Sequence, residues 1–197
     1  QSVGLVLLGL GIGGPIGILA ALLQAINHSI VKSLLFCTMG NILMKYRTRN
    51  LEKIRGMLKA APLTSLLFIL GALALVGMPP LNTFMSKFSI IGAGFAGGHI
   101  WLMIFVLLSL AVIFAALMKV ISSAVFGEMP EGMVRGDVKP WGLIPLAILG
   151  VFIFLLGVYI PPQLDTLLNQ ATNIIMAGQS VIVNSDGLIN FTKMLIP

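Results

Sequence analysis

The chain has 197 residues, of which 58% are hydrophobic and 9% are charged, and its mean hydropathy is +1.06. Because an ordinary soluble domain carries about 25% charged residues, this composition excludes a soluble enzyme domain, and it also excludes a disordered chain, collagen and a coiled coil. The net charge of +6 comes from basic residues clustered in loops without an aromatic stacking surface, so we expect no nucleic-acid binding. Long apolar runs instead predict membrane-spanning helices.

The apolar runs, taken in chain order, predict an all-α, polytopic transmembrane helix bundle. The first run is too short to cross a bilayer, whereas the later ones are ample for a ~30 Å hydrocarbon core at ~1.5 Å per residue. We expect a transmembrane region at 1–162 that consists of a partial helix at 3–10 and four spans at about 16–44, 63–91, 100–126 and 141–160. Because the chain enters an apolar run almost at once, we expect a fragment or a split subunit.

The tail at 163–197 is less apolar than the spans. Leu164, Leu167, Leu168 and Ala171 have helical spacing, which predicts an amphipathic helix. Such a helix suits the membrane interface, and packing against a partner subunit is an equal alternative.

Loop charges predict the orientation in the membrane. The loops at 45–59 and 119–140 carry nine Lys and Arg residues together, whereas the turn at 92–98 carries none and the tail carries one. Because cytoplasmic loops are enriched in Lys and Arg, we expect both basic loops in the cytoplasm and the tail outside. A prokaryotic inner membrane is the expected location.

Two lysines lie inside the predicted spans instead of in loops. Lys32 is in the middle of the second run, and Lys87 follows a pair of prolines in the third. A lysine near the bilayer centre costs about 3 kcal/mol on insertion scales, so it persists where it faces a bundle interior or a hydrated path. We interpret both as proton carriers, and the alternative is a structural lysine paired with a carboxylate elsewhere.

A polar stripe precedes Lys32 on the same predicted helix. Gln24, His28 and Lys32 follow one another at intervals of four residues, so they share one helical face with neighbours ~5–6 Å apart. Histidine titrates near neutrality and passes protons, which favours a proton path over a lone histidine bonded to a neighbouring helix.

The proline pair predicts a broken helix. Pro79 and Pro80 remove two backbone donors, so carbonyls near Leu75 and Val76 lose their helical partners. Irregular backbone at this depth survives inside protein or along a hydrated cavity, and broken helices mark ion sites in transporters. Gly77, Asn82, Thr83 and Ser86 add polarity to this region, and a plain proline kink is the alternative.

Other residues predict structure instead of chemistry. We expect the single cysteine, Cys37, to be a small buried apolar residue, and His99 to be an interfacial residue at a helix end. Gly9, Gly13 and Gly17 are spaced for close helix packing. The acidic residues all fall outside the predicted spans, and no haem, flavin or Cys/His cluster motif is present, so we expect no catalytic centre, metal or cofactor in this chain.

Two motifs resemble a known family. The run Leu22–Phe36, LLQAINHSIVKSLLF, is similar to the eleventh helix of the antiporter-like subunits of respiratory complex I, Mrp antiporters and group 4 membrane-bound hydrogenases. The run Gly77–Phe88, GMPPLNTFMSKF, resembles their broken twelfth helix. The resemblance covers about residues 1–162, corresponding to roughly helices 10 to 14 of that inverted-repeat fold, and the proline pair and the tail favour the hydrogenase-type subunit.

The resemblance implies roles for individual residues. His28 and Lys32 would belong to a central hydrophilic axis, and Lys87 would be the terminal protonatable residue toward the outer exit. Family members often carry a second histidine where this chain has Gln24, which bonds water but holds no proton. The family's first half, with its glutamate–lysine pair, is absent here, so we do not expect the chain to conduct alone.

We therefore predict a proton-translocating subunit of a redox-driven complex, with electron transfer in partner subunits. Two alternatives stay open: a subunit of a stand-alone Na⁺/H⁺ antiporter of the Mrp type, and a structural membrane element. Expected partners are other membrane subunits, including the missing N-terminal half, and the transported ion is H⁺ or Na⁺.

Overall fold

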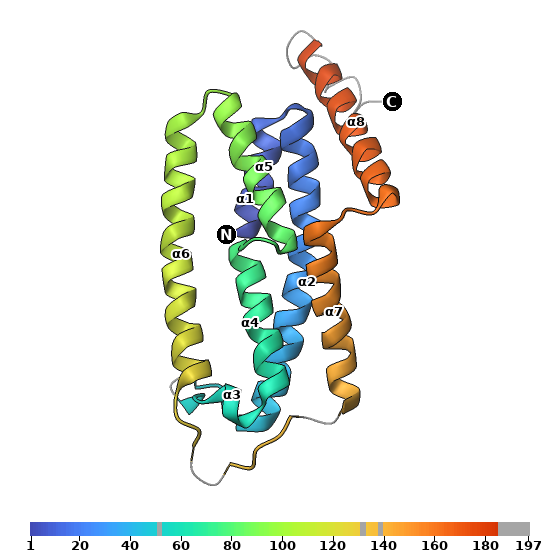
Figure 1. Cartoon of the computed structure of the whole chain (residues 1–197). Helices are drawn as coiled ribbons and strands as arrows, with labels where there is room; N and C mark the ends of the chain where they lie inside the picture. The colour runs from blue at the N-terminus through green and yellow to red at the C-terminus, as the bar shows by residue number, and fades with distance from the viewer. Residues whose placement is uncertain (51–52, 131–132, 138–139, 185–197) are drawn as a thin grey trace, which may run out of the picture.

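A computed structural model describes residues 1–50, 53–130, 133–137 and 140–184. These residues form helices and no strand, as the sequence predicts (Figure 1). The helices in chain order are α1 (Ser2–Ile12), α2 (Gly14–Tyr46), α3 (Met57–Ala60), α4 (Pro62–Val76), α5 (Asn82–Ala96), α6 (Ile100–Phe126), α7 (Pro140–Val158) and α8 (Pro162–Asn184).

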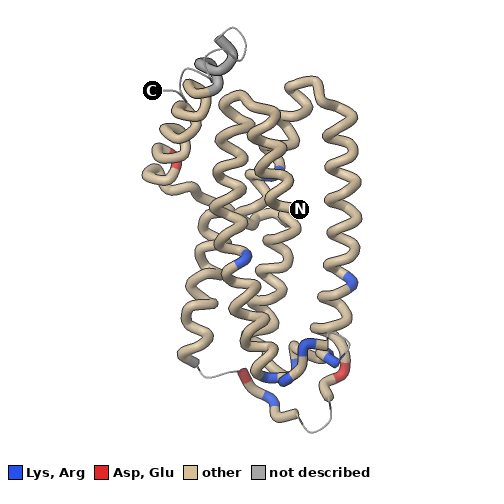
Figure 2. Tube along the Cα trace, turned by 180° about the vertical axis from the view of Figure 1, so that it is seen from behind, with Lys and Arg blue, Asp and Glu red and all other residues tan. Residues whose placement is uncertain are grey.

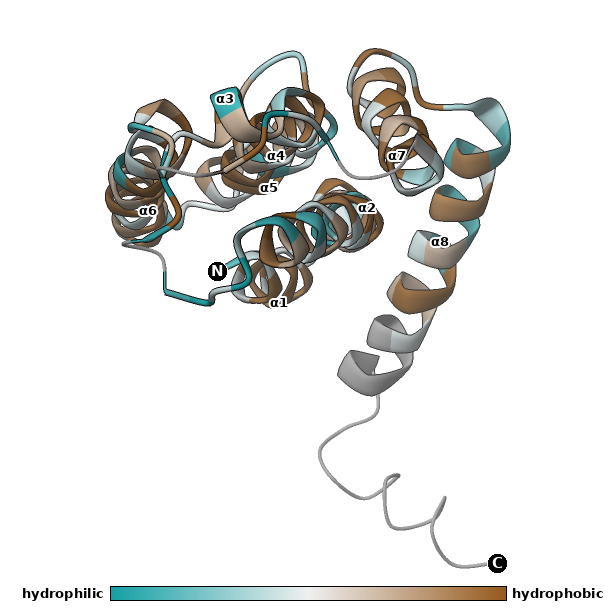
Figure 3. Ribbon diagram, turned by 90° about the horizontal axis from the view of Figure 1, so that it is seen from below, coloured by the Kyte–Doolittle hydropathy of each residue, from teal (hydrophilic) through white to brown (hydrophobic). Residues whose placement is uncertain are grey.

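The helix α2 is the central element of the bundle. It packs against α1, α4, α5, α7 and α8, whereas α6 lies at one edge against α4 and α5 (Figures 1 and 3). Within the described part of the chain, α2, α6 and residues 141–158 of α7 are long and apolar enough to cross a membrane.

The run expected as one span at 63–91 is two shorter helices. α4 and α5 have 15 residues each and lie end to end along the bundle, so that they overlap in the view from below (Figure 3). α7 packs directly against the break between them, where Gly157 approaches the backbone of Pro80. A Cβ at Gly157 would collide with the carbonyl oxygen of Pro80. Only a glycine allows this approach.

Glycines join α1 to α2 as a tight hairpin. A Cβ at Gly9 would lie 2.9 Å from the Cβ of Ala21, and one at Gly17 would lie 2.9 Å from the carbonyl oxygen of Gly9. Gly13 occupies the turn with φ 71°, in the left-handed region. The spacing of these three residues therefore serves packing and chain reversal.

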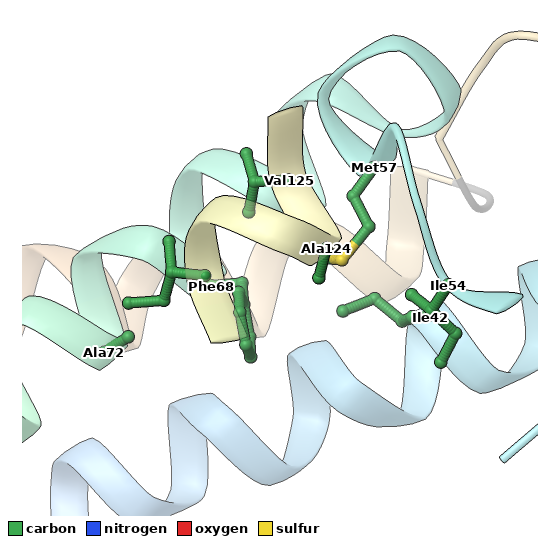
Figure 4. Packing of buried hydrophobic residues seen from close by; sticks show 8 residues of the cluster. Ile42, Ile54, Met57, Phe68, Ala72, Ala124 and Val125 are labelled. Atoms are coloured by element: carbon green, nitrogen blue, oxygen red, sulfur yellow. The ribbon is translucent and has the colours of Figure 1, made fainter. Parts of the chain in front are cut away.

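Three apolar clusters pack the described helices together, and the third joins α1, α2 and α5 through Leu5, Ala20 and Ile90. The first joins α2, α3, α4 and α6 near the basic loops, and Figure 4 shows its side chains interlocking: Ile42, Ile54, Met57, Phe68, Ala72, Ile121, Ala124 and Val125. The second joins α2, α4 and α7 at mid-height through Val31, Leu34, Ala74, Leu81, Leu146 and Ile153.

The two basic loops pack together at one end of the bundle, where most Lys and Arg residues gather (Figure 2). Lys45 Nζ donates to the carbonyl oxygen of Gly136 at 2.7 Å, and the Gly136 amide donates to that of Ala60. The Asp137 carboxylate accepts the backbone N–H groups of Leu63 and Thr64, both at 2.9 Å. This contact caps the first turn of α4 from a distant loop.

The helix α8 leans away from the bundle and is amphipathic (Figure 3). It contacts α2 along a face that includes the buried Leu168 and Thr172, whereas Leu167 is 63% exposed. Residues 185–197 of the expected tail lie outside the described residues.

The expectation for Cys37 is wrong. It is exposed on α2, because the inward face of this helix passes through Leu34, Thr38 and Asn41, and residue 37 falls between those positions. His99 is exposed and occupies the N-cap position of α6.

Candidate functional site

The break between α4 and α5 begins with a turn that ends α4. Gly77 adopts φ 94°, its N–H donates to the carbonyl oxygen of Ala74 at 3.0 Å, and the N–H of Met78 donates to that of Leu73 at 3.1 Å. This is the Schellman arrangement that ends helices at a glycine in the left-handed conformation. The sequence Val76-Gly77 therefore stops the helix before the prolines are reached.

Two carbonyl groups remain at the end of α4. In a continuing helix, Leu75 and Val76 would accept the N–H groups of residues 79 and 80, and both of these residues are proline. Lys87 takes their place: its Nζ donates to the carbonyl oxygen of Leu75 at 2.6 Å and to that of Val76 at 2.9 Å. The lysine thus supplies the two hydrogen bonds that the proline pair removes.

The Lys87 side chain is enclosed by the break. It is 4% exposed, and a Cβ at Gly77 would lie 3.0 Å from its Cδ. Its amine donates to carbonyl oxygens instead of the carboxylate that the structural alternative requires. A positive charge at this position also complements the dipole at the C-terminus of α4.

Buried amide and hydroxyl groups tie α2 to α5 beside Lys87. Asn27 Nδ2 donates to the carbonyl oxygen of Asn82 at 2.8 Å, and Asn82 Nδ2 donates to Asn27 Oδ1 at 3.2 Å. Ser86 Oγ lies 2.5 Å from Gln24 Oε1, and Thr83 Oγ1 donates to the carbonyl oxygen of Ala74. These bonds fix the start of α5 against both α2 and α4.

Asn27 is the residue that sequence reasoning did not assign to the site. The available signal is its spacing, because Asn27 follows Gln24 by three residues and so shares its helical face. Both side chains are buried, at 1% and 0% exposure.

Three buried polar atoms near this network have no hydrogen-bond partner among the described residues. They are Gln24 Nε2, His28 Nδ1 and Asn82 Oδ1. Buried polar atoms are nearly always bonded to protein or to ordered water, and Gln24 and Asn82 are already linked to Ser86 and Asn27. The cluster therefore has the chemistry to bind water molecules beside Lys87.

The polar stripe on α2 turns from the inside of the bundle to its surface. Gln24 is buried, His28 is half-buried and Lys32 is exposed, with its Nζ 5.2 Å from the ring centroid of Phe36. Four residues advance the helix by about 40° beyond a full turn, so the stripe winds around α2. The structure thus joins Gln24 to Ser86, the residue before Lys87 on α5, and it places Lys32 on the exposed face of α2.

An apolar layer separates this site from the basic loops. Along the inward face of α2, Gln24 and Asn27 are followed by Val31 and Leu34, which are both fully buried, and then by the polar Thr38 and Asn41. The polar side chains of α2 therefore lead from Gln24 through His28 to the exposed side of this helix. They do not continue along its inward face to the end of the bundle where the basic loops lie.

The site contains no cluster of acidic, histidine or cysteine side chains within the described part of the chain. Among the residues that the structure describes, no group of three or more His, Cys, Asp or Glu side chains comes together. Lysine, histidine, amide and hydroxyl groups make up the site, and these groups carry and relay protons.

Comparisons with known proteins identify the family of the chain. The family model described as NADH:quinone oxidoreductase/Mrp antiporter, TM, matches residues 1–114. The chain is 30% identical over 176 residues to a Na⁺/H⁺ antiporter subunit from Bacillus subtilis, covering 85% of this chain and 36% of that protein. It is 30% identical over 165 residues to a hydrogenase-4 component F homologue of Methylacidiphilum infernorum, covering 83% of this chain and 33% of that protein.

A solved structure shows the same arrangement of helices. It is the membrane-bound sulfane sulfur reductase, an archaeal respiratory membrane complex, in which one chain is 30% identical with a TM-score of 0.73, covering 83% of this chain and 27% of that one. The chain thus spans about a third of the length of the curated relatives it matches.

Proposed function

Because the chain belongs to the NADH:quinone oxidoreductase/Mrp antiporter family of membrane proteins, we propose that it forms the proton-releasing part of an antiporter-like subunit in a redox-driven membrane complex. Electron transfer takes place in partner subunits, and Lys87 is the group that loads and releases the proton. The observation that carries this proposal is the placement of the Lys87 amine on the two carbonyls of the helix break.

The two carbonyl bonds suit both charge states of Lys87. A lysine ammonium has three N–H donors and the neutral amine has two, so the neutral form still supplies both Leu75 and Val76. Release of a proton therefore leaves the lone pair on Nζ without breaking either bond. The third proton of the ammonium group, which bonds neither carbonyl, is the one that passes to a water molecule or to the next carrier.

The neighbouring polar groups would guide that proton. Gln24 Nε2 and Asn82 Oδ1 have no partner among the described residues and belong to the polar network at the start of α5, the helix that carries Lys87, and His28 offers Nδ1. We propose that water bound by these atoms joins Lys87 to His28, and that Lys32 extends the path to the outer face of α2. Pro79 and Pro80 shape the break because they lack backbone N–H donors. Ser86 holds α5 in place through its bond to Gln24.

The exposed Lys32 supports a partner in the membrane. A lysine facing lipid costs about 3 kcal/mol or more, so its face of α2 needs a protein cover. Ser29, Ser33 and Cys37 are exposed on the same stretch of helix. We propose that the remaining part of a longer subunit, or a separate chain that corresponds to it, covers this face and delivers protons to Lys32.

For the membrane itself we propose a prokaryotic inner membrane, with the packed basic loops in the cytoplasm and α8 outside. The support is the concentration of Lys and Arg at one end of the bundle (Figure 2).

The likeness to the B. subtilis protein supports a second function, a subunit of a stand-alone Na⁺/H⁺ antiporter. The two functions differ in the energy source. In the redox-driven complex, proton movement requires the electron donor, whereas in the antiporter it requires only an ion gradient.

The test measures proton translocation by the assembled complex in proteoliposomes, driven first by electron transfer and then by a Na⁺ gradient. Lys87→Met removes the titrating group, and we expect translocation to fall at least about tenfold, with Lys87→Arg no better because arginine keeps its proton. Lys119→Met is the matched control, since Lys119 is an exposed lysine on α6. Undiminished translocation by Lys87→Met would rule out the carrier role.

A further inference from the structure

A hollow of ≈ 520 Å³ lies at the end of α6, away from the Lys87 site. Its lining comes from the loop after α2 and from the end of α6, and consists of Arg55, Ser122, Ser123, Phe126, Gly127 and Glu128. The lining thus combines one cation, one carboxylate, two hydroxyl groups and one aromatic ring. The proton path described above uses none of these residues.

Close backbone contacts build the hollow. A Cβ at Gly127 would lie 2.8 Å from the Cβ of Arg55, and one at Gly56 would lie 2.5 Å from the backbone nitrogen of Met129. The Tyr46 hydroxyl donates to the carbonyl oxygen of Arg55 at 2.7 Å. These contacts fix the backbone of Arg55 against the end of α6, which limits how far its guanidinium group can move from the hollow.

The position along α6 places the hollow at the edge of the hydrocarbon layer. α6 is a 27-residue apolar helix on the rim of the bundle, and its last residue, Phe126, is 69% exposed. The basic residues gather at this same end (Figure 2). A polar hollow with an exposed aromatic ring at this depth faces lipid headgroups.

The charges select the kind of headgroup. Guanidinium groups bind phosphate through paired hydrogen bonds, and the hydroxyls of Ser122 and Ser123 are further donors to phosphate oxygens. Glu128 repels a bare anion but accepts hydrogen bonds from an ammonium group. We propose that this hollow binds a phosphoethanolamine headgroup, with the phosphate on Arg55 and the serines, the ammonium on Glu128, and an acyl chain along Phe126.

The test uses the full chain in its complex, purified in mild detergent and exchanged into nanodiscs of phosphatidylethanolamine, phosphatidylcholine or phosphatidylglycerol. Lipid retained per complex is counted by native mass spectrometry. We expect phosphatidylethanolamine to be retained preferentially, and Arg55→Ala to weaken its retention at least about tenfold. Glu128→Gln should remove the preference over phosphatidylcholine, whose headgroup has no N–H donor.

Lys53→Ala is the matched control, because Lys53 is exposed in the same loop but does not line the hollow. Equal retention by wild type and Arg55→Ala overturns the proposal, as does equal retention of the three lipids by wild type. Displacement of the lipid by millimolar inorganic phosphate would mean a free-anion site and overturns it too. If Arg55→Ala and Glu128→Gln lower thermal stability in lipid-free detergent but leave lipid retention unchanged, Arg55 and Glu128 only stabilise the fold. This result also overturns the proposal.

Discussion

Lys87 and Lys32 are both lysines within apolar helices, yet the fold treats them in opposite ways. Lys87 is 4% exposed, and its Nζ bonds the carbonyl oxygens of Leu75 and Val76. Lys32 is exposed, and its amine lies over the ring of Phe36. The chain therefore supplies hydrogen-bond acceptors for the buried amine of Lys87, whereas the amine of Lys32 is exposed on the surface of α2.

A lysine in an apolar run can therefore have either of two structural roles. When backbone acceptors without helical donors lie nearby, the lysine completes the fold of its own chain. When such acceptors are missing, the lysine indicates a surface that needs a partner.

The largest effect is expected from returning the lost donors to the break. In the double variant Pro79→Ala and Pro80→Ala, new N–H groups compete with Lys87 for Leu75 and Val76. We expect proton translocation by the complex to fall about tenfold, which corresponds to about 1.4 kcal/mol, one charge-assisted hydrogen bond. Pro145→Ala is the control, because Pro145 lies inside α7 on an exposed position. Equal activity of the double variant and this control would contradict the competition.

A photo-crosslinking amino acid tests whether Lys32 faces protein. Placed at position 32 in the assembled complex, it should crosslink mainly to another membrane segment, with a yield several-fold above that at Val112, which is 69% exposed on α6 at the edge of the bundle. Denaturing gels and mass spectrometry identify the products. If position 32 yields only lipid adducts, Lys32 has no protein cover, and the contrast between the two lysines loses its second half.

The Asn27–Asn82 pair is expected to have a smaller effect, on stability. The two amides bond each other and the Asn82 backbone, so each single alanine variant leaves polar atoms of its partner unpaired. A double-mutant cycle on the free energy of unfolding should give a coupling of about 0.6 to 1.7 kcal/mol, the range for hydrogen bonds between membrane helices. Additive single variants would show that the two side chains act independently.

The smallest effect is expected at the opposite end of α4. Asp137→Asn keeps one of the two oxygen acceptors used by the N–H groups of Leu63 and Thr64, replaces the other with an amide nitrogen that cannot accept, and removes the negative charge at the helix N-terminus. We expect unfolding free energy to fall by about 1 kcal/mol, and Asp137→Ala to cost more because the remaining acceptor oxygen is also lost. Thermal unfolding in detergent checks this, with Asp165→Asn on α8 for comparison. A loss from Asp137→Asn no larger than the loss from that variant would argue against the cap.

Local features of the sequence predict much of the site. The helix break and the identity of its freed carbonyls follow from the proline pair, because the missing N–H groups are a covalent property of residues 79 and 80. The membrane helices follow from apolar length in the same way. The burial of Cys37 and Asn27 does not follow from the local sequence, because it depends on how α2 is rotated against its neighbours. A helix with apolar residues on most sides gives little indication of that rotation.

Local sequence features are enough to predict that this chain crosses a membrane, that a helix is broken at the proline pair, and that the carbonyl groups near Leu75 and Val76 lack helical donors. Which lysine bonds these carbonyl groups depends on how the helices pack. The bonds from Lys87 join residues 12 and 11 positions apart across a break, so they form only when α5 packs against α2 with Asn82 and Ser86 in place. Helical spacing puts Lys32 on the stripe of Gln24, but the winding of that stripe turns the lysine outward, a result of helix geometry combined with the positions of the surrounding helices.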